Sequence, residues 1–407
     1  MDKYKKKDIR PILITSCLSL GGSTTFLLNL ARAFTKAGIE FRIISLEAGN
    51  PLKSEFLPFS GKIKIFDHRK IIFEDRAKEV LKLLAYFKPS HVVSCLGPSS
   101  LEILRYVPKG VGRIGLIQSN DPGPYRSIKR YRKYLDGIGA VSMEILNQLK
   151  RTNGFRKKFL GDVRYGVGLP KRKPLKNRYL NQRPIRILYC GRVIEEQKRI
   201  GLLPHILRQL DHLKVDYRFT LAGDGPDLVK TTKAIDPWIE KGTAVVLGKI
   251  SQREVGGIMS LNDIYLLFSD YEGLPLSLLE GMASGLVPVV SDLGQDFKEL
   301  IKGTGGQLVD PQSPQNYAKA ILKISKHKNK LAKYKSLCHE KWKSDFNLEA
   351  MIRRWVAFLN NVPSKKRGFA KWDKSPKIQA PLPLQNKKLF HPFFRPFRRL
   401  KKLLTQR

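Results

Sequence analysis

The sequence predicts an α/β protein with two domains, each built around a parallel β-sheet. Short apolar segments alternate with helical segments in the first half of the chain, and the alternation restarts at residue 185. Residues 169–184, between the two series, are rich in Pro, Lys and Arg, as is typical of a linker. A length of 407 residues is also more than a single hydrophobic core usually occupies.

The first series contains six expected strands with helices between them. Three lysines at residues 5–7 precede an uncharged run that looks like a signal peptide, but Gly21 and Gly22 interrupt this run. The apolar spacing changes from strand to helix at that point, so we expect a strand, a loop and a helix. The expected strands are 9–16, 41–46, 63–66, 92–95, 113–118 and 137–141, and the helices include 24–37 and about 74–87.

The second series contains expected strands at 185–190, 218–222, 245–247, 264–268 and 287–290. Its most informative segment lies between the last two strands, where Glu272 and Glu280 stand eight residues apart. Pro275 suits the first helical position and Gly285 the position after the helix, so the segment predicts strand, loop, helix and strand.

The first turn of this expected helix is a candidate phosphate site. Its amides at Leu276, Ser277 and Leu278 are expected to be unpaired, and the partial positive charge of the helix N-terminus favours an anion. Glu272 in the preceding loop could meet a sugar, and Glu280 within the helix could accept hydrogen bonds from a ribose. The structural alternative is two solvated glutamates around an ordinary crossover helix.

Three further motifs occur in a fixed order along the chain. Gly21-Gly22 follows the first strand, Cys190-Gly191-Arg192 with Lys198 follows the first strand of the second series, and residues 222–226 read Ala-Gly-Asp-Gly-Pro. An arginine binds a diphosphate through two parallel hydrogen bonds, and a lysine adds a point charge. Taken alone, the cations could be solvated and the glycine pairs could be simple turns.

With all four motifs, the chain resembles the retaining group 1 glycosyltransferases of glycosyltransferase family 4 from about residue 9 to residue 360. The resemblance implies a GT-B fold, in which two Rossmann-like domains with parallel sheets face each other across a cleft. It places an N-terminal, acceptor-side domain at 1–168, a linker at 169–184 and a nucleotide-sugar domain at 185–347. A helix at 348–360 is expected to cross back onto the first domain.

The resemblance also implies roles for individual residues. Glu272 would hold hydroxyl groups of the transferred sugar, and Glu280 would hold the ribose. The diphosphate would contact Arg192, Lys198 and the amides of Leu276, Ser277 and Leu278. Gly22 would let the first loop approach the donor, and the nucleotide base would pack near Ile250. A UDP- or GDP-linked sugar is then a substrate, and neither a cofactor nor a metal ion is expected.

Two candidates in the first domain, Asn120 and Asp121, have alternative roles. Both residues follow an expected strand. Many members of the resembling family place a histidine in this loop near the transferred sugar, and this chain has no histidine there. Either residue could bind the sugar or orient the acceptor hydroxyl. Capping the helix around Tyr125 is the alternative.

The charge of the chain implies an anionic partner, because 76 basic residues against 35 acidic ones give a net charge of +41. Charge alone does not distinguish a membrane surface, a nucleic acid and a phosphorylated substrate. Residues 363–407 form a basic tail, which is expected to be partly disordered. Its end, residues 393–404, shows the pattern of an amphipathic helix at a membrane surface. A solvated or RNA-binding tail is the alternative.

These observations together predict a metal-independent, retaining glycosyltransferase on the cytoplasmic face of the cell membrane, acting on an envelope glycan or glycolipid. The four cysteines are far apart and show no zinc-binding spacing, which fits a reducing compartment. Two alternatives remain open: a glycosyltransferase with a nucleic acid or protein acceptor, and a non-catalytic scaffold that binds nucleotide sugars.

Overall fold

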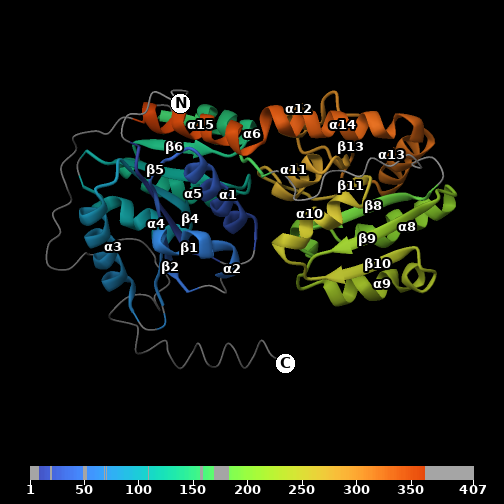
Figure 1. The fold of residues 1–407 in the computed structure, drawn as a ribbon, viewed down its shortest axis with the longest axis horizontal. Helices are drawn as coiled ribbons and strands as arrows, with labels where there is room; N and C mark the ends of the chain where they lie inside the picture. The colour runs from blue at the N-terminus through green and yellow to red at the C-terminus, as the bar shows by residue number, and fades with distance from the viewer. Residues whose placement is uncertain are drawn as a thin grey trace. The chain divides into compact units, whose positions relative to one another are not determined.

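The computed structural model describes residues 9–362, apart from residues 19, 20, 49–52, 68, 70, 109, 156–158 and 169–182. The chain divides into two compact units (Figure 1). The first unit contains the chain up to Val163 together with the residues from Ile352 onward, and the second unit runs from Arg164 to Met351. The expected linker residues 169–182 and the tail from residue 363 lie outside the described residues.

The first unit is built on a seven-stranded sheet in which every pair of neighbouring strands is parallel. The strand order is β3-β2-β1-β4-β5-β6-β7. The strands are β1 (Pro11–Cys17), β2 (Arg42–Glu47), β3 (Ile63–Ile65), β4 (His91–Leu96), β5 (Gly112–Ile117), β6 (Gly137–Ala140) and β7 (Phe159–Asp162). The helices are α1 (Gly22–Lys36), α2 (Lys53–Phe56), α3 (Phe73–Phe87), α4 (Pro98–Ile103), α5 (Pro122–Tyr131), α6 (Met143–Arg151) and the 3-10 turns η1 (Leu57–Lys62), η2 (Leu104–Tyr106) and η3 (Arg132–Tyr134).

The second unit repeats this design with six parallel strands in the order β10-β9-β8-β11-β12-β13. The strands are β8 (Ile185–Cys190), β9 (Tyr217–Ala222), β10 (Ala244–Gly248), β11 (Ile264–Leu267), β12 (Val287–Ser291) and β13 (Gln307–Val309). The helices are α7 (Glu195–Lys198), α8 (Leu202–His212), α9 (Leu228–Glu240), α10 (Gln252–Ser260), α11 (Leu276–Ala283), α12 (Gln295–Ile301), α13 (Pro314–Lys326) and α14 (Lys328–Asp345). Helix α15 (Leu348–Asn361) spans the boundary between the units.

The predicted fold class, two Rossmann-like α/β domains with parallel sheets, is confirmed. All eleven expected strands are present with shifts of at most two residues at their ends. The uncharged run near the N-terminus forms β1 and α1, as expected, and residues 19 and 20 between them lie outside the described residues. Sequence reasoning missed β7 and β13, because each is an edge strand of only three or four residues without a clear apolar run.

Helix α15 places its apolar stripe against the first unit. Trp355 is fully buried, and its ring lies 6.2 Å from the ring of Phe26 and 6.1 Å from that of Phe34, both in α1. Phe358 lies over the glycine-containing strands β6 and β7, and a Cβ at Gly161 would fall 2.0 Å from its ring. The small residues of these strands therefore create the space that the helix fills.

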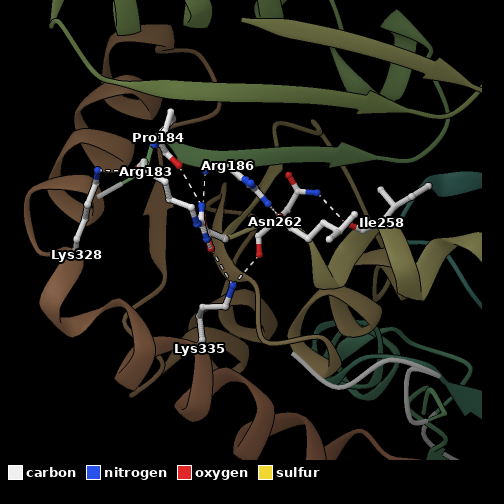
Figure 2. A network of polar contacts seen from close by, with 9 residues as sticks. Arg183, Pro184, Arg186, Ile258, Asn262, Lys328 and Lys335 are labelled. Atoms are coloured by element: carbon white, nitrogen blue, oxygen red, sulfur yellow. Dashed lines mark hydrogen bonds and ion pairs between the residues drawn. The ribbon is translucent and has the colours of Figure 1, made fainter. Parts of the chain in front are cut away.

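A buried ionic network fixes the start of β11 in the second unit (Figure 2). Asp263, which is fully buried, accepts hydrogen bonds of 2.7 and 2.8 Å from the guanidinium of Arg183 and one of 2.9 Å from Nζ of Lys335. The backbone N–H of Arg186 in β8 donates a further bond of 3.0 Å. Burial alone would raise the pKa of Asp263, but Arg183 and Lys335 outweigh that effect and hold the pKa below its ordinary value.

Candidate active site

The candidate residues of the second unit gather where its strand order reverses. Strands β9 and β11 lie on either side of β8, so the loops that follow β8 and β11 leave the same edge of the sheet in opposite directions. Ligands of open α/β sheets bind in the crevice outside this edge. The two loops are joined directly, since the N–H of Asp270 donates to the carbonyl of Gln197 at 2.9 Å and Nε2 of Gln197 donates to the carbonyl of Tyr271 at 3.1 Å.

Two residues that were expected to act separately, Lys198 and Glu272, form an ion pair. Their side chains are only 12% and 8% exposed. Oγ of Ser269 donates a second hydrogen bond of 2.7 Å to the same carboxylate oxygen of Glu272. The carboxylate is therefore held in one orientation at the end of β11, and Lys198 has a partner of opposite charge. An ammonium carries three donors, so Lys198 can still reach a phosphate oxygen.

The start of α11 differs in two details from the prediction. Pro275 is the capping residue, and the helix begins at Leu276. The amide of Leu278 is not free, because it donates to the carbonyl of Pro275 at 3.1 Å. Among the described residues, the amides of Leu276 and Ser277 have no acceptor. The expected anion site at this helix is therefore made of two amides and not three, since the first turn closes with a short i→i+3 bond.

Ser277 is tied into the sheet by a hydroxyl cluster. The hydroxyl of Tyr265, a fully buried residue of β11, lies 2.6 Å from Oγ of Ser277 and 2.9 Å from the carbonyl of Cys190. This cluster links the end of β8 and the first half of β11 to the first turn of α11. Burial, followed by the charge of Glu280, raises the pKa of the Cys190 thiol to about 12, so the thiol is neutral at pH 7.

Arg192 lies in the loop after β8, and the backbone around it is closely packed. Its carbonyl accepts a hydrogen bond of 2.7 Å from the hydroxyl of Tyr189, while its side chain is exposed and has no partner among the described residues. Gly223, with φ of +150°, supports this loop from behind, since a Cβ there would lie 1.8 Å from the carbonyl oxygen of Gly191. The Gly-Asp-Gly-Pro motif thus acts as a structural support, as its turn chemistry predicts.

Glu280 accepts a hydrogen bond from Gln252, a residue that the sequence motifs did not identify. Nε2 of Gln252, the first residue of α10, donates to Oε1 of Glu280 at 2.8 Å. Helix α10 follows directly after Ile250, and Ser251 caps it in a reciprocal arrangement with Glu254. Gln252, two residues after Ile250, therefore links the first turn of α10 to α11, although 28 positions separate Gln252 and Glu280 in the sequence. No local pattern marked Gln252 or Ser269, because their roles depend on contacts between distant segments.

The candidates of the first unit lie at the carboxyl edge of its own sheet and contact two different cavities. Asp121 accepts a hydrogen bond of 2.9 Å from the amide of Gly123 and caps α5, as the structural alternative predicted. It also lines a cavity of about 340 Å³ at the ends of β4 and β5, to which Ser23 in the first turn of α1 contributes. Gly22 is the residue before Ser23 and begins α1.

Asn120 lines a second cavity, of about 240 Å³, on the other side of α5. Its Oδ1 accepts a hydrogen bond of 2.7 Å from the hydroxyl of Tyr125. Two adjacent residues that were alternatives for the same role therefore take different positions. Asn120 belongs to the surface between α5 and α6, and only Asp121 lines the cavity at the end of the sheet.

The second unit thus offers a carboxylate held by a lysine, an exposed guanidinium and two unpaired amides at one edge of a parallel sheet. This arrangement suits a diphosphate with polar groups on both sides of it. In the part of the chain that the structure describes, no three His, Cys, Asp or Glu side chains are grouped so that they could hold a metal ion.

Comparison with known proteins shows that part of this unit is similar to a known family. Residues 184–327 match the family model described as glycosyl transferases group 1. This match lies within the second unit, and it agrees with the resemblance that the sequence motifs indicate.

The curated relatives share about half of their length with this chain. WcaL of Salmonella typhimurium, named as a colanic acid biosynthesis glycosyltransferase, is 27% identical over 187 residues, which are 44% of this chain and 46% of WcaL. AmsK of Erwinia amylovora, an amylovoran biosynthesis glycosyltransferase, is 28% identical over 200 residues, which are 47% of this chain and 49% of AmsK.

Among solved structures, Anabaena HepE in complex with UDP and glucose has a TM-score of 0.71 and is 14% identical. The comparison covers 86% of this chain and 99% of HepE. At this identity the likeness concerns the fold alone, and it extends over both units.

Proposed function

We propose that the protein is a retaining glycosyltransferase that moves a sugar from a UDP- or GDP-linked donor to a hydroxyl group of an envelope glycan or glycolipid. The observation that carries this proposal is the set of groups at the carboxyl edge of the second sheet. The proposal is supported by Glu272 with Lys198, by Arg192 in the loop after β8 and by the free amides of α11, all in the unit that contains the match to the family model.

In the proposed reaction, the protein positions the substrates and stabilises charge that develops on the leaving diphosphate. Arg192 and the amides of Leu276 and Ser277 bind the phosphates, and Lys198 contacts them while it holds Glu272. Glu272 accepts hydrogen bonds from sugar hydroxyl groups, and Glu280 accepts them from the ribose. The acceptor oxygen bonds to the anomeric carbon from the face that the diphosphate leaves, so the configuration of the sugar is retained. The bond between that carbon and the diphosphate oxygen breaks, and the hydroxyl proton passes to the departing diphosphate.

The proposed acceptor class, an envelope glycan or glycolipid, is supported by the relatives. Both WcaL and AmsK are named for the biosynthesis of a bacterial polysaccharide. The cytoplasmic membrane surface is the proposed place of action, because the basic end of the chain has an amphipathic pattern at residues 393–404, which lie outside the described residues. In the described part of the chain, no helix has both the length and the apolar character needed to cross a membrane.

A donor screen tests the proposal. Purified protein is incubated with a panel of UDP- and GDP-sugars, with and without a lipid-linked glycan acceptor, and the released nucleoside diphosphate is measured. We expect turnover of at least one donor, and we expect EDTA to leave the rate unchanged because basic groups neutralise the diphosphate. Arg208→Ala, which removes an exposed arginine of α8, serves as a control and should keep full activity. Release of no diphosphate from any donor would contradict the proposal.

A further inference from the structure

The first unit carries a basic surface that the proposed donor site does not use. It is formed by α5, η3 and α6 and is defined by seven exposed residues: Arg126, Lys129, Arg130, Arg132, Lys133, Lys150 and Arg151. The side chains of Arg126, Lys129, Lys150 and Arg151 are exposed, and no carboxylate lies within ion-pair distance of them in the described residues. Lys150 and Arg151 suit the last turn of α6, but Arg126 lies in the middle of α5, where the helix dipole gives no reason for a cation.

This basic surface is hollowed by the second cavity described above. The cavity of about 240 Å³ lies between α5 and the end of α6, and its polar lining consists of Asn120, Tyr125, Arg126, Lys129, Gln148 and Thr152. Amide and hydroxyl groups of this kind hydrogen-bond sugar hydroxyl groups, and the two cations attract carboxylates or phosphates. We refer to this cavity with Arg126 and Lys129 as the basic groove.

The basic groove begins next to the cavity at the end of the sheet. Asp121 lines that cavity, and Asn120, its neighbour in the chain, lines the groove. Helix α5 contributes to both, with Ser127 and Ile128 on one side and Arg126 and Lys129 on the other. An oligosaccharide that extends from the first cavity past the start of α5 would reach the groove.

We propose that the basic groove binds an acidic glycan, so that the acceptor is an oligosaccharide carrying carboxylates or phosphates behind the hydroxyl that receives the sugar. This inference rests on the proposed function, because it names the class of acceptor. A membrane surface fits the groove less well, since none of the large apolar residues that are exposed in the described structure lies on α5 or α6. Exposed apolar side chains occur elsewhere in this unit, for example Leu57 and Tyr86.

Binding of a defined acidic oligosaccharide tests the groove. A fluorescently labelled hexamer of galacturonic acid is titrated with the full-length protein, and the carboxyl-reduced hexamer is titrated in parallel. The test variant is Arg126→Glu/Lys129→Glu. The matched control is Lys62→Glu/Lys64→Glu, which makes the same charge change in the same unit at two lysines without an acidic partner in the described residues. Because the basic tail is present in all three proteins, its contribution cancels.

We expect the groove variant to bind the acidic hexamer at least about 10-fold more weakly than wild type, and the control to change by less than about 2-fold. The reduced hexamer should bind weakly to all three proteins. Equal weakening in the two variants would show only a general effect of charge and would overturn the proposal. Arg126→Gln/Lys129→Gln, which changes the helix surface less, should show the same direction of effect.

Two further measurements separate this proposal from others. If the groove variant loses affinity only for a hexameric RNA or for phosphatidylglycerol vesicles, with the acidic hexamer unaffected, the groove serves another partner and the inference is wrong. UDP and GDP binding is measured in the same proteins. If the groove variant binds both nucleotide and the acidic hexamer like wild type, the groove proposal is wrong and the proposed function stands. If wild type itself binds neither UDP nor GDP, the proposed function is wrong.

Discussion

Lys198 and Glu272 are 74 positions apart in the chain, yet each is the main partner of the other. The sequence motifs identified both residues, because each motif follows a strand of the second series. Their pairing could not be predicted, since it depends on the neighbouring positions of β8 and β11 in the sheet. Ser269 and Gln252 were missed for the same reason: a serine or glutamine at a strand or helix end is common, and only the contact gives it a role.

The two phosphate-side cations should respond differently to removal. Arg192→Ala should cost about 2–4 kcal/mol of transition-state stabilisation, with little change in folding stability because its side chain is exposed and unpaired. Lys198→Ala should lower activity and also reduce the free energy of unfolding by about 1–3 kcal/mol, since Glu272 would lose its partner. Kinetics of donor turnover and urea denaturation measure the two effects.

A double variant tests whether the stability lost in Lys198→Ala comes from the unpaired carboxylate of Glu272. Lys198→Ala/Glu272→Ala should recover part of the unfolding free energy, because no unpaired carboxylate remains. Wild-type activity in Arg192→Ala would contradict the role of Arg192 as a phosphate ligand. Equal stability losses in Arg192→Ala and Lys198→Ala would contradict the difference between an unpaired arginine and a lysine paired with Glu272.

At the scale of elements, the central strands and helices were predictable and the short edge strands were not. Buried parallel strands are short apolar runs, and this signal located β1, β2, β8, β11 and β12 to within two residues. Strands β7 and β13 have too few apolar residues for such a signal. The expected N-terminus of α11 was correct in place but wrong in detail, since Pro275 caps the helix and its carbonyl takes the amide of Leu278.

The buried network at the start of β11 predicts a dependence of stability on pH. The folded pKa of Asp263 is below its ordinary value of 3.8, so its ion pairs contribute fully above about pH 4 and are lost as the pH falls through the lowered value. Asp263→Asn should lower the unfolding free energy by about 3–5 kcal/mol at pH 7, because Arg183 and Lys335 lose their shared anion.

Urea unfolding of wild type and Asp263→Asn at a series of pH values measures this dependence. The difference between the two proteins should be constant at neutral pH and should shrink in acid, as the wild-type carboxylate becomes protonated. A difference that grows as the pH falls would have the wrong sign and would refute the role of the ionised carboxylate.

At the scale of the whole molecule, the tail remains a sequence-based prediction. Residues 364–407 carry 14 basic residues against one acid and lie outside the described residues. If residues 393–404 bind an anionic bilayer, deletion of 364–407 should release the protein from phosphatidylglycerol vesicles, while donor hydrolysis stays nearly intact. Binding should weaken as salt screens the basic residues. Cosedimentation with charged and neutral vesicles measures this, and equal pelleting of both forms would place the anchor elsewhere.

The central claim is that the carboxyl edge of the second sheet binds a nucleotide sugar. Calorimetric titration of UDP and GDP into wild type, Glu280→Ala and Glu240→Ala tests it most directly, because Glu240 is an exposed glutamate at the end of α9 without a partner in the described residues. Wild type and Glu240→Ala should bind one nucleotide with equal affinity, and Glu280→Ala should bind it at least about 10-fold more weakly, since the ribose loses its acceptor. Unchanged affinity in Glu280→Ala, or no binding of either nucleotide to wild type, would contradict the claim.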